Sequence, residues 1–413
     1  MYTFVIQLID LLARGQVGLF LVFFIVTWAL YITKLIKSAK TPKIKVDRNI
    51  QLSEYPSITV IIPVVDEPMH VWEHTLTNVK DSIYGLKAQV LVVANGGNGK
   101  KEGAYAKKLG FDVISIEQAS KRRAIAAASS ISNGEVTIIL DSDTITTRDA
   151  MRTLLQAFED KRVGGATPRH VIDMWFAENI SSKRNIWRRI ADWLEDIRFE
   201  EVLKGQNGAV GCLPGRLLAI RTKLLHKYID GLVGQRFLGK PCISGDDRYL
   251  TSRLLEDGFK TVYVEDSMVI TQAPDTLKGF VQQRLRWSRT SLRETILSLN
   301  WIFRYPYLAL TTLANVIMRW FFFVVVVTAI LAWVGIIDRP HVVNLSFEVV
   351  VLGTIIGYIM SGFFRHLRHL LNKPQDIVLL PVFLFVTNFI LTPVEWFGNL
   401  TLIESGWMTR DTK

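Results

Sequence analysis

Two acidic clusters in this sequence stand where carboxylates could carry out chemistry, and the first is Asp141-Ser142-Asp143. It directly follows Val136 to Leu140, an apolar run that predicts a buried strand. Aspartate oxygens are hard ligands, and Mg²⁺ or Mn²⁺ binds a few of them together with the phosphate oxygens of a substrate. An Asp-x-Asp triplet is also common in solvated loops. Its place at the end of a predicted strand is what favours a metal site.

The second cluster, Asp246-Asp247, precedes a helical pattern over Tyr249 to Glu256. A carboxylate at this place could act as a general base and take a proton from an attacking hydroxyl group. The same pair could instead cap the helix, since aspartate is favoured at the first position of a helix. One aspartate acting as the base and the other as the cap would satisfy both interpretations.

A third group of functional side chains is Gln282-Gln283-Arg284-Leu285-Arg286-Trp287, which places amides, guanidiniums and an indole at helical spacing. Indole rings stack on sugars, arginine pairs with phosphate in bidentate fashion, and glutamine hydrogen-bonds hydroxyl groups. These side chains fit the transfer of a sugar. A tryptophan flanked by arginine is also an ordinary anchor at a membrane surface.

Apolar, β-rich runs separated by helix-length segments would position these groups. The runs are Ser57 to Ile62, Gln89 to Val93, Asp112 to Ile116 and Val136 to Leu140. This alternation predicts a mostly parallel α/β sheet. Because ligands of such sheets bind beyond the carboxyl ends of the strands, residues shortly after the strands are candidates for donor binding. These candidates are Asp66, Glu67, Asn95 and Asp141.

The uncharged run Val17 to Thr33 predicts a membrane anchor, because a spanning helix needs about 20 apolar residues. Basic residues follow it, namely Lys34, Lys37, Lys40, Lys43, Lys45 and Arg48. Such residues are enriched on the cytoplasmic flank of membrane helices. We therefore expect an integral protein of the plasma membrane with a cytoplasmic catalytic domain. A cleaved signal peptide is the alternative, but the run is long, begins far from Met1 and lacks a small-residue cleavage site.

Two later runs, Trp320 to Ile337 and Val349 to Phe364, are also long enough to cross a membrane. For Ile377 to Val394, which Pro381 and Pro393 bracket, we expect a re-entrant or interfacial hairpin. The predicted organisation is an anchor over 1–37, a cytoplasmic α/β domain over 38–300, and interfacial and transmembrane helices over 301–413.

The composition agrees with a membrane-associated protein that has an anionic partner. Hydrophobic residues make up 49% of the chain, and 49 Lys plus Arg against 38 Asp plus Glu give a formal charge of +11. The lysines gather beside the anchor rather than along an aromatic-lined groove, which argues against a nucleic-acid partner. The two cysteines, Cys212 and Cys242, lack the short spacing of metal or disulfide motifs, so we expect both to be reduced and structural.

Five motifs carry a resemblance to a known family. They are Lys121-Arg122-Arg123-Ala124, Asp141-Ser142-Asp143-Thr144, Phe237 to Thr251 with its Gly245-Asp246-Asp247-Arg248 core, Gln283-Arg284-Leu285-Arg286-Trp287, and Trp407-Met408-Thr409-Arg410. In order and approximate spacing they resemble family 2 glycosyltransferases that synthesise polysaccharides, of the hyaluronan synthase type. The last motif is similar to the C-terminal gate of hyaluronan and nodulation chitooligosaccharide synthases. The resemblance covers Pro56 to Glu294 and Pro393 to Arg410.

The resemblance implies a GT-A type α/β domain combined with membrane helices, and an inverting transfer from a nucleotide sugar to a growing polysaccharide. Asp143 would hold Mg²⁺ or Mn²⁺, and Asp141, Lys121 and Arg122 would contact the donor. Asp247 would be the base, with Asp246 beside it. The acceptor and diphosphate site would comprise Cys212, Arg248, Gln283, Arg286 and Trp287. The gate would comprise Trp407, Thr409 and Arg410.

The chain departs from the family pattern at two places. Ala94-Asn95-Gly96-Gly97 replaces the usual Asp-Asp-Gly-Ser run that recognises uracil, which leaves the nucleotide open. The segment Gly211 to Arg216 replaces a Ser-Gly-Pro pattern on the acceptor side, which leaves the polymer open. Two further alternatives remain, namely an enzyme that adds one sugar to a lipid, and a transporter subunit whose cytoplasmic domain only binds nucleotide.

Overall fold

A computed structural model describes residues 16–47, 49–173, 185–336 and 347–404 of the chain. The chain folds into two compact units. The larger comprises Ser38–Leu308 and Phe397–Lys413, and the smaller comprises Met1–Lys37 and Ala309–Trp396. Each unit is described by itself below.

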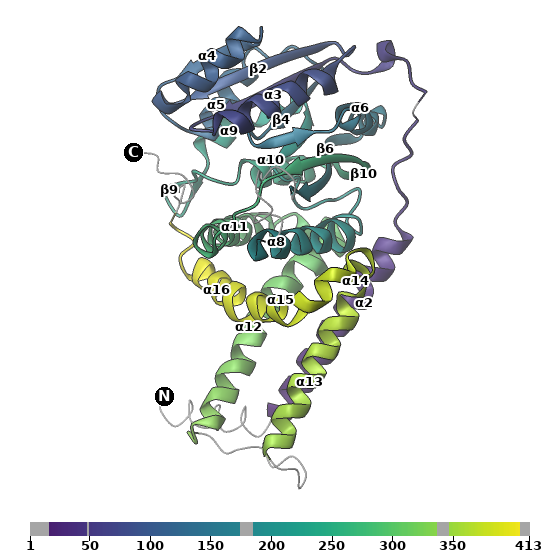
Figure 1. Cartoon of the computed structure of the whole chain (residues 1–413), viewed down its shortest axis with the longest axis vertical. Helices are drawn as coiled ribbons and strands as arrows, with labels where there is room; N and C mark the ends of the chain where they lie inside the picture. The colour runs from purple at the N-terminus through teal and green to yellow at the C-terminus, as the bar shows by residue number, and fades with distance from the viewer. Residues whose placement is uncertain (1–15, 48, 174–184, 337–346, 405–413) are drawn as a thin grey trace. The chain divides into compact units, whose positions relative to one another are not determined.

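The larger unit is built on a mixed eight-stranded sheet (Figure 1). Its strands are β1 Ile58–Val64, β2 Ala88–Asn95, β3 Asp112–Ile116, β4 Val136–Leu140, β5 Thr144–Thr146, β6 Val163–Ile172, β7 Leu217–Arg221 and β10 Lys260–Thr271. Their order is β3-β2-β1-β4-β7-β6-β10-β5. The pairs β1–β2, β1–β4, β2–β3 and β6–β10 are parallel, while β7 is antiparallel to both of its neighbours. The predicted α/β fold is therefore confirmed, and the four predicted strands correspond to β1 to β4.

Helices cover both faces of this sheet. They are α3 Met69–Ile83, α4 Lys100–Lys108, α5 Lys121–Ser129, α6 Ala150–Leu155, α8 Ile186–Ile197, α9 Thr222–Gly234, α10 Asp246–Glu256 and α11 Leu277–Ser298. A π-helix, η4 Arg198–Leu203, continues α8, and the short 3-10 helices are η1 Leu52–Glu54, η2 Gly97–Gly99, η3 Gln156–Glu159 and η5 Ile302–Arg304. A two-stranded hairpin, β8 Arg236–Phe237 and β9 Lys240–Pro241, precedes α10.

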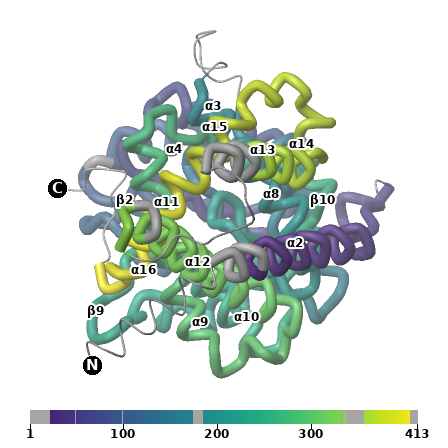
Figure 2. Tube along the Cα trace, turned by 90° about the horizontal axis from the view of Figure 1, so that it is seen from below, coloured from purple at the N-terminus to yellow at the C-terminus, as the bar shows by residue number. Residues whose placement is uncertain are grey.

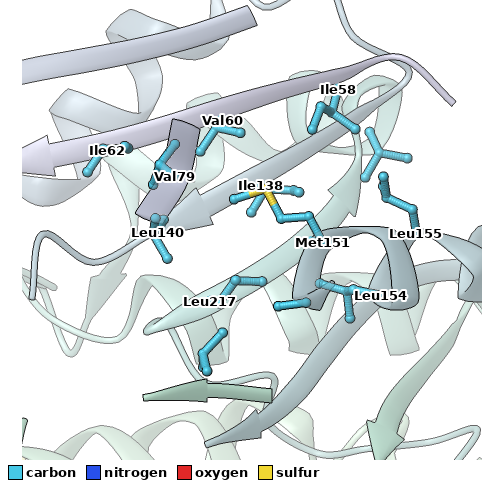
Figure 3. Close-up of a cluster of buried hydrophobic side chains, with 14 of the residues drawn as sticks. Ile58, Val60, Ile62, Val79, Ile138, Leu140, Met151, Leu154, Leu155 and Leu217 are labelled. Carbon is cyan, nitrogen blue, oxygen red and sulfur yellow. The ribbon is translucent and has the colours of Figure 1, made fainter. Parts of the chain in front are cut away.

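Successive side chains of a strand point to opposite faces of the sheet, and this divides the hydrophobic core into two layers. Val60 and Ile62 of β1 point toward α3, α4 and α6, as Figure 3 shows for part of this cluster. Ile61 of the same strand points to the other face, where it joins side chains of α5, α9 and α10. All seven residues of β1 are buried because the strand is covered on both faces, and its one polar residue, Thr59, donates its hydroxyl to Gln89 Oε1 over 2.9 Å.

The smaller unit is helical. Its elements are α2 Gln16–Lys40, α12 Pro306–Trp333, α13 Phe347–Arg365, α14 Leu367–Asn372, η6 Pro374–Leu379, α15 Leu380–Phe385, η7 Val386–Leu391 and α16 Thr392–Leu400. A few residues at one end of α2, α12 and α16 are counted with the larger unit. The Tyr31 hydroxyl donates to the Arg365 carbonyl over 2.8 Å, and Phe23 contacts Phe321 and Phe322. Helix α2 therefore lies beside both α13 and α12 (Figures 1 and 2).

Within the described residues, three segments are long and apolar enough to cross a membrane, namely Val22–Lys40, Pro306–Leu331 and Pro374–Leu400. The first contains most of the predicted anchor, and α13 coincides with the run Val349 to Phe364. The hairpin predicted over Ile377 to Val394 is wrong. Helical turns continue without a reversal from Pro374 to Leu400, since Pro381 stands in the first turn of α15, where a missing N–H is tolerated.

Candidate active site

The turn after β4 presents the predicted pair of carboxylates. The Asp141 amide donates to the Arg216 carbonyl over 3.0 Å, and the Thr144 amide closes the turn onto the Asp141 carbonyl over 3.1 Å. Ser142 points inward, where its carbonyl accepts from the Thr75 hydroxyl over 2.9 Å. The side chains of Asp141 and Asp143 are only half-buried. The turn therefore buries its serine and leaves both aspartates accessible.

Glu67 supports this turn from beneath. Its side chain is buried, and its Oε2 accepts from the Ser142 hydroxyl over 2.7 Å. Asp66 is exposed and has a positive φ of 48°, an uncommon conformation outside glycine. We predicted both residues at the donor site. Glu67 holds the Asp141–Asp143 turn through Ser142, and a contact of Asp66 or Glu67 to the donor stays a prediction.

Lys121, the first residue of α5, joins the two acidic clusters. Its Nζ lies 2.5 Å from Asp141 Oδ1 and 3.2 Å from Asp246 Oδ2. Burial disfavours the charged form of Lys121, but the two carboxylates outweigh it and raise the pKa of this lysine. Burial is likewise outweighed at Asp246, where Lys121 and Arg122 lower the pKa of the carboxyl group. The strand end and the start of α10 therefore meet around one ammonium group.

Arg122 does not face this site. Its guanidinium is buried and donates to the carbonyls of Leu232 and Ser244 over 2.7 and 2.9 Å. Consecutive helix residues point about 100° apart, so the side chains of Lys121 and Arg122 leave α5 in different directions. Arg122 therefore holds the segment that leads into α10, and its contact to the nucleotide stays a prediction.

Asn95 is also turned inward. It ends β2, the residue is 4% exposed, and its Oδ1 accepts from the Ser120 amide over 2.7 Å. Ser120 is the N-cap of α5, because its hydroxyl accepts from the Arg123 amide. Asn95 therefore fixes the residue that precedes Lys121, and the oxygen that we expected to meet a nucleotide base is already engaged.

The start of α10 places Asp247 differently from Asp246. Gly245 caps the helix with a positive φ of 88°, so neither aspartate is the N-cap residue. Asp247 is half-buried, and its Oδ2 accepts from the Gly215 amide over 3.2 Å and lies 3.8 Å from the Cys212 thiol. Asp246 forms an ion pair with Lys121, whereas the Asp247 carboxylate accepts from the backbone amides of Gly215 and Arg248. Asp247 is the better placed of the two to accept a proton.

Helix α11 brings the tryptophan motif to the same region. Gln283, Arg286 and Trp287 are half-buried on this helix, and Arg248 is half-buried at the start of α10. The Arg216 guanidinium lies over the Trp287 ring at 5.6 Å from its centroid. Arg216 follows the Cys212 segment, whose thiol contacts Asp247. Cys212 therefore contacts the predicted base directly, and Trp287 is linked to Cys212 through Arg198, whose guanidinium contacts both.

No group of three or more His, Cys, Asp or Glu side chains suited to a metal occurs among the described residues. Mg²⁺ commonly uses one or two protein carboxylates and takes its other ligands from substrate phosphates and water. Burial and the nearby charge of Asp143 raise the pKa of Asp141. Two carboxylates that repel each other at an accessible turn are a donor set that fits a hard divalent cation.

Comparison with known proteins decides the family. The model of the family described as "Glycosyltransferase like family 2" matches residues 53–290, which is more than half of the chain. This chain is a member of glycosyltransferase family 2. The expected enzyme class and the resemblance to family 2 polysaccharide synthases are thereby confirmed.

Among curated relatives, an N-acetylglucosaminyltransferase of Rhizobium meliloti (strain 1021) is 28% identical, with 86% of this chain and 82% of that protein covered. An N-acetylglucosaminyltransferase of Rhizobium sp. (strain N33) is 33% identical, but the match covers 60% of this chain and only 55% of that protein. The hyaluronan synthase of Streptococcus pyogenes is 27% identical over 72% of this chain and 67% of that protein.

A solved structure has the same fold. The mannosyltransferase PcManGT from Pyrobaculum calidifontis, in complex with GDP-Man and Mn²⁺, matches with a TM-score of 0.65 and 16% identity. The match covers 95% of this chain and 100% of that one. At this identity the likeness establishes the GT-A fold alone.

The predicted C-terminal gate of this glycosyltransferase, Trp407, Thr409 and Arg410, lies outside the described residues. The segment before it is held to α11. Arg289 Nε and Nη2 donate to the Thr401 hydroxyl over 3.0 and 2.9 Å, and its Nη2 lies 2.5 Å from Glu404 Oε2. The helix that carries Trp287 therefore also anchors the chain that leads to residue 405.

Sequence reasoning missed Glu195 and Arg198, of which Arg198 contacts the predicted acceptor residues Cys212 and Trp287. Both belong to a helical segment, α8 with η4, that sequence analysis did not place at the site. A π-helical turn contains more residues than an α-helical turn, so a hydrophobic pattern with a period of 3.6 residues does not predict which side chains face the site there. No signal in the sequence pointed to Glu195, because its burial and its pairing with Arg216 are visible only in the structure.

Proposed function

We propose that this glycosyltransferase polymerises sugars from nucleotide-sugar donors, with UDP-sugars expected, into a hyaluronan-like or other extracellular polysaccharide that it exports. The observation that carries the proposal is the Lys121 ammonium between Asp141 and Asp246, at 2.5 and 3.2 Å. It joins a metal-binding turn at a strand end to the segment that holds a general base. Relatives named N-acetylglucosaminyltransferase and hyaluronan synthase support a sugar polymer as product.

The transfer is a single displacement at the anomeric carbon. Asp247 takes the proton of the acceptor hydroxyl while that oxygen forms a bond to the anomeric carbon and the bond to the nucleotide diphosphate breaks, which inverts the configuration. Asp246 does not serve as the base because its ion pair with Lys121 stabilises the carboxylate form and weakens its affinity for a proton. Its role is to fix Lys121 beside the donor.

Asp143 and Asp141 would hold Mg²⁺ or Mn²⁺ together with the donor phosphates. The cation would supply positive charge that stabilises the departing diphosphate. Glu67 keeps the turn in shape through Ser142, so that both carboxylates stay on its accessible side. Gln283, Arg286 and Arg248 are assigned to the diphosphate and acceptor.

We propose that the donor nucleotide contains uridine. Asn95 contributes less to binding of the base than a free amide side chain would. The Asn95 oxygen already accepts from Ser120, so one lone pair and the amide nitrogen remain for a base edge. Binding titrations with UDP, GDP and ADP test this directly. A clear preference for GDP or ADP would reject the uridine donor.

The function is tested with the full chain in detergent, Mn²⁺ and radiolabelled nucleotide sugars, followed by specific glycosidases and sizing of the product. We expect a polymer that grows with time. A product carrying a single sugar on extracted lipid would support the glycolipid alternative instead. Binding of nucleotide without any turnover would leave only the transporter alternative.

The membrane arrangement belongs to the same proposal. Helices α2, α12 and the run Pro374–Leu400 are candidate spans, and the basic residues after α2 favour a cytoplasmic catalytic unit in the plasma membrane. Labelling of single introduced cysteines from either side of sealed cells tests this topology. Reaction of a catalytic-unit cysteine with an outside reagent would contradict it.

A further inference from the structure

One face of helix α11 carries polar side chains along its whole length. Its first half presents Gln283 and Trp287, two of the predicted acceptor residues, which are half-buried. The same spacing of three and four residues continues in the second half with Thr290, Arg293 and Glu294, which are buried. Residues three and four apart lie on the same face of an α-helix. The two groups are therefore parts of one stripe, and only the first has an assigned role.

The second half of this stripe contacts the β8–β9 hairpin. Glu294 Oε1 accepts from Gln235 Nε2 over 2.5 Å, and Arg293 Nη1 donates to Cys242 Sγ over 3.4 Å. The Cys242 amide donates to the Gln235 carbonyl over 2.9 Å, so these two residues lie opposite each other at the base of the hairpin. Helix α11 therefore holds both arms of the hairpin where they meet.

The contacts of α11 continue from the hairpin to the acidic pair. The Ser244 and Thr290 hydroxyl oxygens lie 3.3 Å apart and share a hydrogen bond. A Cβ added to Gly245 would lie 2.1 Å from the Thr290 methyl group, so the two chains pack without spare room there. Gly245 is the N-cap of α10, and the predicted base Asp247 stands two residues later. The helix that carries the predicted acceptor residues thus also contacts the segment that leads to the base.

Arg122 of α5 holds the same segment through its backbone. Its guanidinium donates to the carbonyls of Leu232 and Ser244, which lie before and after the hairpin, over 2.7 and 2.9 Å. These two bonds fix the ends of the segment, whereas the bonds to Arg293 and Glu294 fix the base of the hairpin between them. The segment is therefore positioned relative to α5 and α11 together.

Arg293 and Glu294 are charged groups at places where apolar side chains would be expected. They are only 2% and 5% exposed. Burial raises the pKa of Glu294, and the hydrogen bond from Gln235 and the nearby arginines offset this only in part. Well-packed apolar side chains are often as stable as buried charges of similar size. Stability alone does not account for these two residues, whereas directional contacts that set the position of the hairpin do.

We propose that Arg293 and Glu294 are positioning residues for sugar transfer. They hold the segment that carries Asp247 in register with Gln283 and Trp287 on the same helix, so that the base meets the acceptor hydroxyl. Both act through the hairpin and not on the reacting groups themselves. The inference rests on the proposed function, because it concerns the step in which Asp247 takes the hydroxyl proton while the acceptor oxygen bonds to the anomeric carbon and the diphosphate leaves.

The register is measured as the ratio of sugar transfer to donor hydrolysis by the full chain in detergent, with Mn²⁺ and radiolabelled UDP-N-acetylglucosamine. In hydrolysis, a water molecule takes the place of the acceptor hydroxyl at the anomeric carbon. Water can reach the base wherever it lies, whereas the acceptor hydroxyl is held by α11, so only transfer requires the register. A smaller amount of folded protein lowers both rates by the same factor and leaves the ratio unchanged.

Arg293→Met and Glu294→Ala should each lower this ratio by roughly tenfold to hundredfold, because a misplacement of about 1 Å has an effect of that order. Glu294→Gln keeps an oxygen that can accept from Gln235, so it should retain most of the ratio. Glu256→Gln is the matched control. It removes a carboxylate that pairs with Arg253 over 2.6 Å near the far end of α10, and it should leave the ratio as in the wild-type chain.

Backbone hydrogen exchange, followed by mass spectrometry, is a second readout that needs no turnover. Peptides from residues 235–247 should exchange faster in Arg293→Met and Glu294→Ala than in the wild-type chain, and Glu256→Gln should not change them. Transfer and hydrolysis that fall by the same factor would overturn the inference, and so would unchanged exchange in both variants. If the wild-type chain transfers no sugar from any donor, the proposed function fails, and exchange alone decides whether α11 holds the segment that carries the acidic pair.

Discussion

Replacing Lys121 by glutamine removes the one ammonium that joins Asp141 to Asp246. At 3.2 Å and an effective dielectric constant of about 20, the Lys121–Asp246 attraction is about 5 kcal/mol before desolvation is counted. Burying the two ions costs several kcal/mol each, so most of that attraction offsets their desolvation. Removing one partner leaves the other charge buried without compensation. We therefore expect Lys121→Gln to lower the free energy of unfolding by about 3–5 kcal/mol.

The assay is denaturant unfolding of the full chain in detergent, with Lys260→Gln as the matched control. Lys260 lies 2.9 Å from Asp160, but both side chains are over a third exposed, and a pair of that kind contributes little. The double variant Lys121→Gln with Asp246→Asn should recover part of the loss, because it also removes the unpaired carboxylate. A Lys121→Gln protein as stable as Lys260→Gln would refute the reasoning.

The effect of Lys121→Gln also has a predicted pH dependence. The folded-state pKa of Asp246 is lowered from 3.8, so its ion pair stabilises the fold above that value and the stabilisation is lost as the pH falls through the folded pKa. The stability difference between the wild-type chain and Lys121→Gln should therefore shrink below about pH 4. A difference that stays constant from pH 7 into that acid range would contradict the ion-pair account.

Four other perturbations test the roles and contacts described above. Asp143→Asn should abolish both metal-dependent donor hydrolysis and transfer. Asp247→Asn should keep donor binding but lower the transfer rate by roughly two to four orders of magnitude. Near-normal polymer synthesis by Asp247→Asn would show that Asp247 is not the base. Gly245→Ala should lower the free energy of unfolding by roughly 2–4 kcal/mol, because φ is 88° and an added Cβ would lie 2.1 Å from the Thr290 methyl group. Gly110→Ala is the control for backbone strain alone, because φ is 84° there and no atom lies near the added Cβ. Truncation after Glu404 should spare nucleotide affinity and sharply lower polymer synthesis, and full activity of the truncated chain would dismiss the gate.

The sequence predicts those strands of the sheet that are mainly apolar, which are β1 to β4. Strands β3 and β4 have the predicted bounds because charged or glycine-containing turns delimit them. The insertion of β7 between β4 and β6 could not be predicted in this way. It pairs residues that are far apart in the sequence, and hydrophobic patterns specify which residues are buried but not which strand lies beside which.

Residue types located the candidate site, but side-chain direction decided which members face it. The sequence places Lys121 and Arg122 together, yet helix geometry turns one toward Asp141 and the other toward Leu232 and Ser244. In the same way the Asp141-Ser142-Asp143 turn alternates, with its serine buried against Glu67. Composition and spacing do not carry these directions, because they follow from where each element begins and what packs against it.

The position of Lys121 is locally unfavourable, and that is an argument for function. A cation in the first turn of a helix opposes the helix dipole, and a buried lysine loses its hydration. The fold compensates with Asp141 from a strand end and Asp246 from the start of another helix, two residues that would repel each other without the lysine. A purely structural site would be as stable with apolar side chains of similar size. Three charged groups at an accessible strand end bring no gain in stability over apolar side chains. They are the arrangement expected where a charged donor binds beside a base.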